Sequence, residues 1–311
     1  MATQPHFGVM VPQFKRTWEE SRSAASGFES MGYDSLWVND HLYGATSPQT
    51  PVLEAWAMLA GLAAITERVE LGTLVTPTAM RNPAHLGKTI ATVDSMSGGR
   101  IIPGLGAGWM EREFTDFGVP FPPIGERLRH LRESIEFFRR MWSEEALTFQ
   151  GELIQSEDLY CAPAPARPPP ILVGGTGEKV TLRIVAELAD IWNNSARNQS
   201  LLEHKVNVLK GHCVEAGRDF GELVISQQCV VTIAEDEAAL APMVEKAQKI
   251  YGGHMGDPAG PIALTGTPDK VGDRIQEHLN LGCSMFMIEF FGRDTREPAA
   301  LFAEKVLPRF R

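Results

Sequence analysis

Eight short apolar runs alternate with segments of helical periodicity along the 311 residues of the chain. The runs lie at residues 7–11, 35–39, 69–75, 101–106, 171–174, 190–193, 223–233 and 285–290. Most are followed by segments whose apolar residues recur every three or four positions, as Leu128, Leu131 and Ile135 do. Eight such units favour a closed α/β barrel, a (β/α)8 TIM barrel, over an open doubly wound sheet. In such a barrel the functional groups lie on the loops that follow the strands.

The fourth unit has the clearest boundaries. Its helix is predicted to begin at Asn82 and Pro83, a capping residue followed by proline, and to end at the glycine pair 98–99. The strand that follows is short and apolar, as expected for a parallel strand that is covered on both faces. Alternating glycines at 104–108 would let a ligand approach bare backbone amides where this strand ends.

Two segments depart from the alternation, but neither marks a domain boundary, so residues 1–311 are expected to form a single domain. Residues 145–170 contain a predicted small hairpin, centred on 147–154, and then a proline-rich spacer that leads to the fifth strand. Residues 236–263 contain an extra helix and then a glycine-rich segment, 252–261, on the expected active face. That segment is either a mobile lid or an inert connection.

Composition narrows the possible partners and compartments. The chain carries 39 acidic and 29 basic residues, a formal net charge of −10, which argues against general nucleic-acid binding. Its four cysteines lie far apart and signal neither a zinc cluster nor a redox dithiol. The N-terminus lacks the basic and apolar regions of an export signal, so a cytoplasmic location is expected.

The apolar run at 52–65 raises the question of a membrane span. It contains Glu54 and is shorter than the roughly 20 residues that a spanning helix needs, so no membrane association is expected. Its apolar residues occur all round the helix, and such a helix must be covered on more than one side. Either the domain itself or a second subunit covers it, and we expect a homodimer.

Four short motifs fall at predicted strand ends. Asp40 and His41 follow the second strand, where His41 would exchange a proton; a capping aspartate beside a structural histidine is the alternative. Residues 71–78 place hydroxyl groups and a proline after the third strand, as either a bulge against a flat ring or a simple turn. The glycines at 104–108 and 174–177 suit a phosphorylated cofactor, and the second group comes directly before a predicted helix.

Other catalytic classes lack their motifs. The histidines show no HxH or HExxH spacing, so no metal site is predicted. The chain has no GxSxG nucleophile elbow, and its glycines match neither the GxxxxGK[ST] phosphate loop nor the GxGxxG dinucleotide fingerprint. Two lesser alternatives are a catalytically silent flavin-binding barrel and a hydrolase with Asp40 and His41 as metal ligands.

Taken in order, these motifs resemble the bacterial luciferase-like superfamily, and most closely the branch that uses the deazaflavin coenzyme F420. The resemblance is carried by residues 35–41, 71–77, 82–83, 94–109, 170–175, 189–193 and 266–268, with the strand through 288–290. It covers nearly the whole chain, and the ordered set is more specific than any single motif. It implies a (β/α)8 barrel that holds the isoalloxazine-like ring at its C-terminal mouth.

The resemblance also assigns the motifs to parts of the cofactor. Asp40 and His41 would border the reactive face of the ring. The bulge behind the ring would consist of Thr73, Leu74, Val75 and Thr76, with a cis peptide bond between Leu74 and Val75. The phosphate and side chain of the cofactor would be held by Ala107, Gly108, Gly174, Gly175, Thr176 and Gly177.

One position departs from the family pattern. In the sugar-phosphate dehydrogenases of this branch a catalytic Glu follows the glycine that matches Gly108, whereas this chain has Trp109. Glu113 is the nearest carboxylate at a matching position, and His41 is the expected proton donor. Trp109, with residues 197–200 and 252–261, would line the substrate pocket.

Two functions follow from the resemblance. The first is an F420-dependent oxidoreductase that transfers a hydride between C5 of the deazaflavin and a small organic substrate. The alternative is a luciferase-like monooxygenase of the same fold that takes reduced FMN from a partner flavin reductase and activates O2. The two rings differ by carbon or nitrogen at position 5, and no motif in the sequence reads that atom directly.

Overall fold

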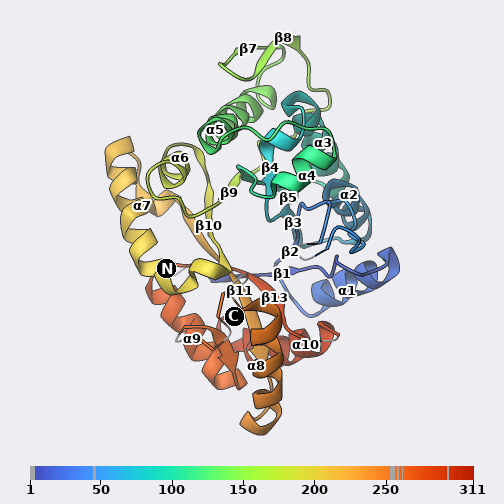
Figure 1. Ribbon diagram of the computed structural model, residues 1–311, viewed down its shortest axis with the longest axis vertical. Coiled ribbons are helices and arrows are strands. Elements are labelled where there is room, and N and C mark those ends of the chain that lie inside the picture. Colours follow the sequence, from blue (N-terminus) through green and yellow to red (C-terminus); the bar gives the residue numbers. More distant parts are fainter. Residues whose placement is uncertain (1–3, 45–46, 253–255, 258, 261, 293) are drawn as a thin grey trace.

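The predicted strands form a ring in the computed structural model, which describes residues 4–311 apart from 45–46, 253–255, 258, 261 and 293. They are β1 (His6–Met10), β2 (Ser35–Val38), β3 (Glu70–Thr73), β5 (Ile101–Ile102), β6 (Gly104–Gly106), β9 (Leu172–Gly174), β10 (Ile191–Asn194), β11 (Val224–Ile233) and β13 (Met285–Phe290). All pair in parallel, in the order β6, β9, β10, β11, β13, β1, β2, β3, β5. Only Pro103 separates β5 from β6, so together they close the ring. The (β/α)8 barrel is confirmed (Figure 1).

Two further short strands lie at the ends of the predicted ones. These are β4 (Thr76–Pro77), which pairs with β6, and β12 (Leu264–Gly266), which pairs with β11. The strand predicted at 69–75 therefore ends earlier and resumes as β4 beyond a bulge. The strand predicted at 101–106 is interrupted at Pro103, because proline has no N–H to donate to a neighbouring strand.

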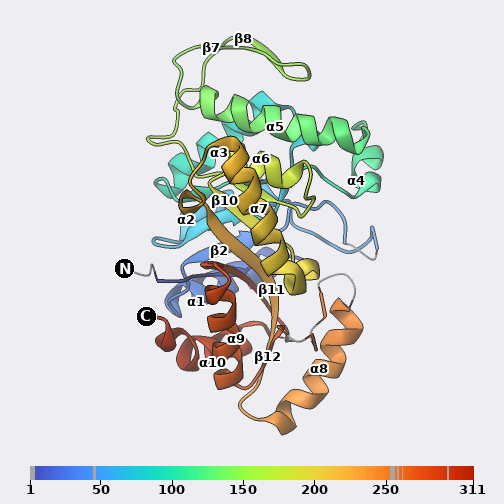
Figure 2. The same cartoon turned by 90° about the vertical axis from the view of Figure 1, so that its left-hand side faces the viewer.

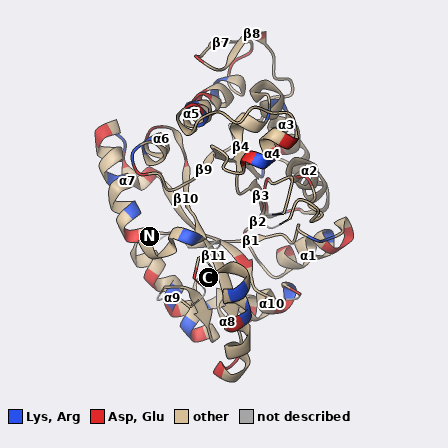
Figure 3. Ribbon diagram, viewed as in Figure 1, with Lys and Arg blue, Asp and Glu red and all other residues tan. Residues whose placement is uncertain are grey.

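Helices surround the ring of strands in the described part of the chain (Figure 1). They are α1 (Trp18–Ser30), α2 (Ala55–Ile65), α3 (Pro83–Ser97), α4 (Glu111–Asp116), α5 (Ile124–Met141), α6 (Thr181–Leu188), α7 (Leu202–Ala216), α8 (Glu237–Tyr251), α9 (Pro268–Asn280) and α10 (Arg296–Lys305). Figure 3 shows the charged residues mainly on these helices and few on the central strands. Inside the ring, alternate strand positions form an apolar cluster that includes Met10, Trp37, Ile102, Leu172 and Met287.

The predicted boundaries of α3 are confirmed. Oδ1 of Asn82 accepts a hydrogen bond from the backbone N–H of His85, and Pro83 is the first helical residue. Gly98 ends the helix with φ of 71°, a value that favours glycine. The chain then turns directly into β5, which places the end of β6 at the mouth of the barrel.

The predicted hairpin projects from one end of the molecule, as both side views agree (Figures 1 and 2). Its strands, β7 (Leu147–Gln150) and β8 (Gln155–Leu159), are antiparallel. The return strand lies beyond the stretch 147–154 that suggested the hairpin, because residues 151–154 form the turn. That turn is held by the Glu133 carboxylate, which accepts from the backbone N–H groups of Glu152, Leu153 and Ile154.

The two remaining sequence features concern α8 and α2. Helix α8 is the predicted extra helix, but residues 253–255, 258 and 261 of the segment after it lie outside the described residues, so its role as lid or connection stays a prediction. Helix α2 begins where the Glu54 side chain accepts from the N–H of Ala57, and its exposed face carries Ala57 and Ala64. No helix in the described part of the chain is long and apolar enough to cross a membrane.

Candidate active site

A cavity of about 480 Å³ lies where the ends of five strands meet. Its lining comes from the loops after β2, β3, β6 and β9, from the end of β10, from Gln228 in the middle of β11, and from one face of α5. The volume is within the range of small-molecule sites. The four motifs that the sequence analysis treated separately therefore meet at one cavity.

The structure separates the predicted site residues into two groups. Those that line the cavity are Asp40, His41, Leu74, Val75, Ala107, Gly108, Trp109, Gly174, Gly175 and Gly177. Those that do not line it are Thr73, Thr76, Glu113 and Thr176. The first three of these are buried behind residues that do line the cavity.

His41 and Glu113 form a pair at the edge of the cavity. Nδ1 of His41 lies 3.0 Å from Oε2 of Glu113, and the backbone N–H groups of Leu42 and Tyr43 donate to Oε1 at 2.6 and 3.0 Å. Burial alone would raise the pKa of Glu113, but these hydrogen bonds and the His41 ring hold it below its usual value. An ionised carboxylate only accepts hydrogen bonds, so it fixes the hydrogen of His41 on Nδ1.

Asp40 is held rigidly in the cavity wall. Its carboxylate receives two parallel hydrogen bonds from Arg81, Nη1 to Oδ2 at 2.9 Å and Nη2 to Oδ1 at 2.8 Å. The Thr76 hydroxyl donates to Oδ2 at 2.7 Å. Burial raises the pKa of Asp40, and the charge of Arg81 opposes that rise. The carboxylate therefore keeps one orientation in the cavity wall.

The bulge between β3 and β4 has the predicted cis peptide bond between Leu74 and Val75. The Thr73 hydroxyl donates to the carbonyl of Gly104 at 2.8 Å, and the Val75 side chain lies in the cavity lining. A Cβ on Gly106 would come within 2.6 Å of Val75 Cγ2, and a Cβ on Gly174 within 2.8 Å of Cγ1.

The alternating glycines at 104–108 were expected to let a ligand approach the backbone, but most of them make room for neighbouring parts of the chain. A Cβ on Gly104 would lie 1.9 Å from the carbonyl oxygen of Thr73, so this glycine makes room for the neighbouring strand rather than for a ligand. Gly106 likewise makes room for Val75. Gly108 has φ of 76° and lines the cavity, so it alone of the three combines a left-handed backbone with a place in the site.

The second glycine loop is anchored from outside the cavity. The amide of Asn198 donates to the Thr176 hydroxyl at 3.2 Å, and Nζ of Lys205 donates to the Thr176 carbonyl at 3.1 Å. Helix α6 begins at Thr181, so three residues separate Gly177 from the helix that was expected to follow directly. The loop and the first turn of α6 still share the cavity, because Gly177 and Thr181 both line it.

Trp109 lies across the entrance beside His41. Its ring centroid is 5.6 Å from that of His41 in an edge-on arrangement, and 58% of the residue is exposed. A large, exposed aromatic side chain at this place suits contact with a substrate that enters from solvent.

Sequence reasoning missed Arg81 and the polar end of the cavity. At that end Asn193 donates to the Ser226 hydroxyl at 3.1 Å, and Gln228 lies beside it in the lining. The sequence held a signal for Asn193 and Gln228, because they are polar residues within predicted buried strands. Nothing local indicated Arg81, since its partner Asp40 lies 41 residues earlier.

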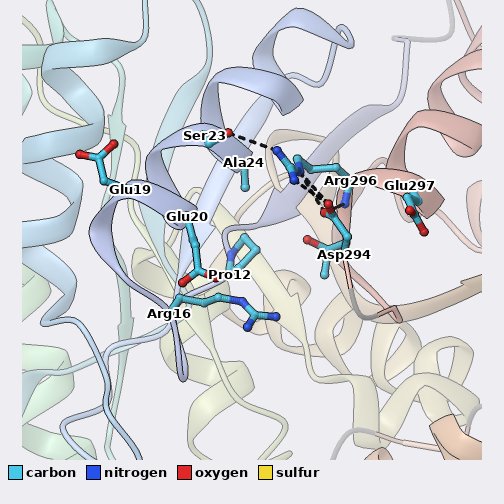
Figure 4. Close-up of a pocket in the computed structure, with 10 residues that line it drawn as sticks. Pro12, Arg16, Glu19, Glu20, Ser23, Ala24, Asp294, Arg296 and Glu297 are labelled. Atoms are coloured by element: carbon cyan, nitrogen blue, oxygen red, sulfur yellow. Dashed lines mark hydrogen bonds and ion pairs between the residues drawn. The ribbon is translucent and has the colours of Figure 1, made fainter.

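A second cavity, of about 660 Å³, lies between the start of α1 and the segment before α10 (Figure 4). Charged groups that line it contact one another: Arg296 donates to both carboxylate oxygens of Asp294 and to the Ser23 hydroxyl. It shares no lining residue with the first cavity. Among the described residues, no group of three or more His, Cys, Asp or Glu side chains is placed to hold a metal ion.

Comparison with known proteins decides the family. A family described as luciferase-like monooxygenase matches residues 1–284. The chain belongs to this family. Within the luciferase-like proteins, an F420-dependent glucose-6-phosphate dehydrogenase from Nakamurella multipartita is 29% identical over 322 aligned residues, which cover 94% of this chain and 92% of that protein.

Solved structures of similar shape come from both chemical branches of the luciferase-like fold. An F420-dependent secondary alcohol dehydrogenase, in complex with an F420-acetone adduct, has a TM-score of 0.84 and 21% identity, and the match covers 99% of this chain and all of that one. A monooxygenase from Streptomyces bottropensis has a TM-score of 0.81 and 22% identity over 98% of this chain and 100% of that one. At these identities the likeness establishes the fold alone.

Proposed function

We propose that the protein is an F420-dependent oxidoreductase that transfers a hydride between C5 of the deazaflavin and a carbon of a small organic substrate. The observation that carries the proposal is the convergence of Asp40, His41, the cis bulge and both glycine loops on one cavity. The F420-dependent dehydrogenase that is similar over 94% of this chain supports the choice of cofactor.

The residues present suit a flat ring with a phosphorylated side chain. Leu74 and Val75 give the cavity an apolar wall against which a ring packs. Asp40 and Gln228 offer polar groups at its edges. The loop at 174–177 and the first turn of α6 offer backbone N–H groups, which suit a phosphate.

The chain's own part in the reaction is to hold a proton and to orient the reacting groups. When bound, F420 supplies or accepts the hydride. His41 takes a proton from the substrate oxygen, or returns one, through Nε2, because Nδ1 faces Glu113. The Glu113 carboxylate holds the ring of His41 in place and keeps its hydrogen on Nδ1.

A hydride-transfer assay without oxygen tests this proposal. The protein is incubated anaerobically with oxidised F420 and a panel of small alcohols, and the absorbance of oxidised F420 is followed. We expect its loss with at least one neutral alcohol. If F420 is reduced by none of them while reduced FMN supports oxygen uptake and substrate oxygenation, the proposal is wrong.

The second candidate is the monooxygenase that receives reduced FMN from a partner reductase. The description of the matching family favours it, and so does the presence of a monooxygenase among the similar folds. The same assay separates the two, because oxygen uptake with FMN is the signature of the alternative.

We also propose that the luciferase-like chain is a single barrel domain over residues 1–311 and forms a homodimer in the cytoplasm. The support for a dimer is the outer face of α2, where Ala57 and Ala64 are exposed on a helix with no charged residue between Ala55 and Ile65. Next to it, a groove of about 560 Å³ runs between α2 and α3. An apolar face of this kind suits a second copy of the chain.

A further inference from the structure

The cavity wall at Asp40 is backed by an ion-pair network that the proposed proton transfer does not use. Nη2 of Arg81, which contacts Asp40, also donates to Oε1 of Glu54 at 2.8 Å. The side chains become more exposed along this series, from 2% at Asp40 to 20% at Arg81 and 40% at Glu54. Arg81 therefore connects a buried carboxylate in the cavity with a half-exposed one in the groove between α2 and α3.

The Asp40 carboxylate accepts hydrogen bonds from two side chains. Thr76 and Arg81 donate to Oδ2, and Arg81 donates to Oδ1. The Thr76 hydroxyl is itself held in place, because it accepts from the indole N–H of Trp56 at 3.1 Å and lies 3.1 Å from the Thr73 hydroxyl. The two parallel hydrogen bonds from the Arg81 guanidinium are the geometry of an ion pair with a carboxylate.

The charge of Arg81 is what makes an ionised Asp40 tolerable at this depth. A buried carboxylate without a partner takes up a proton instead of keeping its charge. Burial raises the pKa of Asp40, and the negative charge of Glu54 also raises it. The hydrogen bonds from Arg81 and Thr76 and the positive charge of Arg81 lower it. His41 also lines the cavity, and it is paired with Glu113, which is buried behind it.

We propose that Arg81 is a positioning residue for the cofactor, which keeps the Asp40 carboxylate ionised and in one orientation so that it accepts a hydrogen bond from an N–H or O–H group of the ring. The proposal rests on the proposed function, because it takes the cavity to hold that ring. Oδ2 already accepts two hydrogen bonds and Oδ1 one, so the acceptor position that remains is on Oδ1.

The test compares the dissociation constant for F420 of the wild type and of Arg81→Met across the neutral pH range. Without Arg81, Asp40 is protonated at the acidic end and regains its charge as the pH rises. We expect R81M to bind about tenfold more weakly than the wild type near pH 6, with the ratio falling toward one by about pH 8.5. Any ionisation of F420 itself affects both dissociation constants equally and cancels in their ratio. A purely structural role for Arg81 would give the same ratio at every pH, which would overturn the proposal.

Two further variants complete the test. The dissociation constant for F420 of the R81M/D40N double variant, divided by that of D40N, is expected to be independent of pH. A pH dependence of this ratio overturns the proposal. Arg139→Met is the matched control, because Arg139 pairs with Asp190 at 2.9 Å just before β10, at the opposite end of that strand from the cavity. R139M should bind F420 as the wild type does.

A second readout needs no cofactor. The free energy of unfolding of R81M should decrease relative to R81M/D40N as the pH rises from about 5 to about 8, because the folded protein then holds a carboxyl whose pKa lies above its unfolded value. Equal pH dependence of the two variants would overturn the role of Arg81. If the wild type binds FMN and not F420, the proposed function fails, and the binding test of Arg81 is then made with FMN.

Discussion

His41 and Glu113 lie 72 residues apart in the chain and contact each other at the edge of the cavity. The Glu113 carboxylate orients the His41 ring, and the ring helps to hold the pKa of Glu113 below its usual value. The place of His41 after a barrel strand made it a candidate from the sequence alone. Glu113 was a candidate as a carboxylate just beyond Trp109, but its contact with His41 was not predictable, because a pairing over that distance depends on how the loops after β2 and β6 fold over the mouth. The same limit applies to Arg81 and Asp40.

Replacement of His41 tests the proton role at the residue scale. We expect His41→Ala to lower kcat about 100-fold, the usual contribution of a general acid or base, while the dissociation constant for F420 changes little. His212→Ala is a control, because His212 lies within 3.4 Å of Glu215 on α7, among residues that do not line the cavity. An unchanged kcat in H41A at neutral pH would exclude His41 as the proton donor.

Replacement of Glu113 gives a stability that depends on pH. The folded-state pKa of Glu113 is held low, so its stabilising effect is present above the unfolded pKa and is lost as the pH falls through the folded one. We expect Glu113→Gln to lower the free energy of unfolding by about 2 kcal/mol at neutral pH. The difference from the wild type, measured by urea unfolding, should shrink below about pH 4. A constant difference down to strongly acid pH would contradict this assignment.

At the scale of elements, the sequence predicted the strands and α3 better than their interruptions. Apolar runs identify strands that are covered on both faces, and Asn82, Pro83 and Gly98 are local signals for a helix start and end. The breaks at Pro103 and at the bulge depend on neighbouring backbone, which a single run does not reveal. The return strand β8 was missed because its residues are polar and mostly exposed, unlike the strands of the barrel.

The bulge and its glycines give a prediction at the same scale. Gly106→Ala should lower the free energy of unfolding by about 1–3 kcal/mol, since its Cβ would meet Val75 Cγ2 at 2.6 Å, and Val75→Ala should restore much of the loss. Gly104→Ala meets the Thr73 carbonyl at 1.9 Å, and no side-chain change relieves that. Gly211→Ala is the control, because an exposed helix position with open space gains stability of about 0.5–1 kcal/mol. Equal effects of G106A with and without V75A would show that the packing account is wrong.

At the scale of the whole molecule, the barrel places residues from separate motifs at one mouth, and the expected dimer would leave that mouth open. The apolar face of α2 lies on the outside of the ring, so a second copy there does not enter the cavity. The sequence could predict that α2 needs cover on more than one side, because its residues are apolar all round. The sequence could not show which residues of α2 are covered by the core of the same chain.

Charges introduced on α2 test the dimer. Ala57→Glu together with Ala64→Glu should convert a dimer to a monomer in sedimentation equilibrium, because two buried, unpaired carboxylates at a subunit interface cost several kcal/mol. Val214→Glu, at a position on α7 that is 81% exposed, is the control and should leave the mass unchanged. A wild type that sediments as a monomer, or a double variant that stays dimeric, would place the interface elsewhere.

The most direct test of the central claim is a competitive anaerobic titration of the wild-type protein with F420 and FMN. We expect one F420 bound per chain and at most about a tenth of it displaced by a tenfold excess of FMN, which requires F420 to bind about 100-fold more tightly, a difference of about 2.8 kcal/mol. Asp40→Asn should weaken this binding if the ring lies in the cavity at the barrel mouth. Stoichiometric binding of FMN, with F420 unable to displace it, would contradict the account.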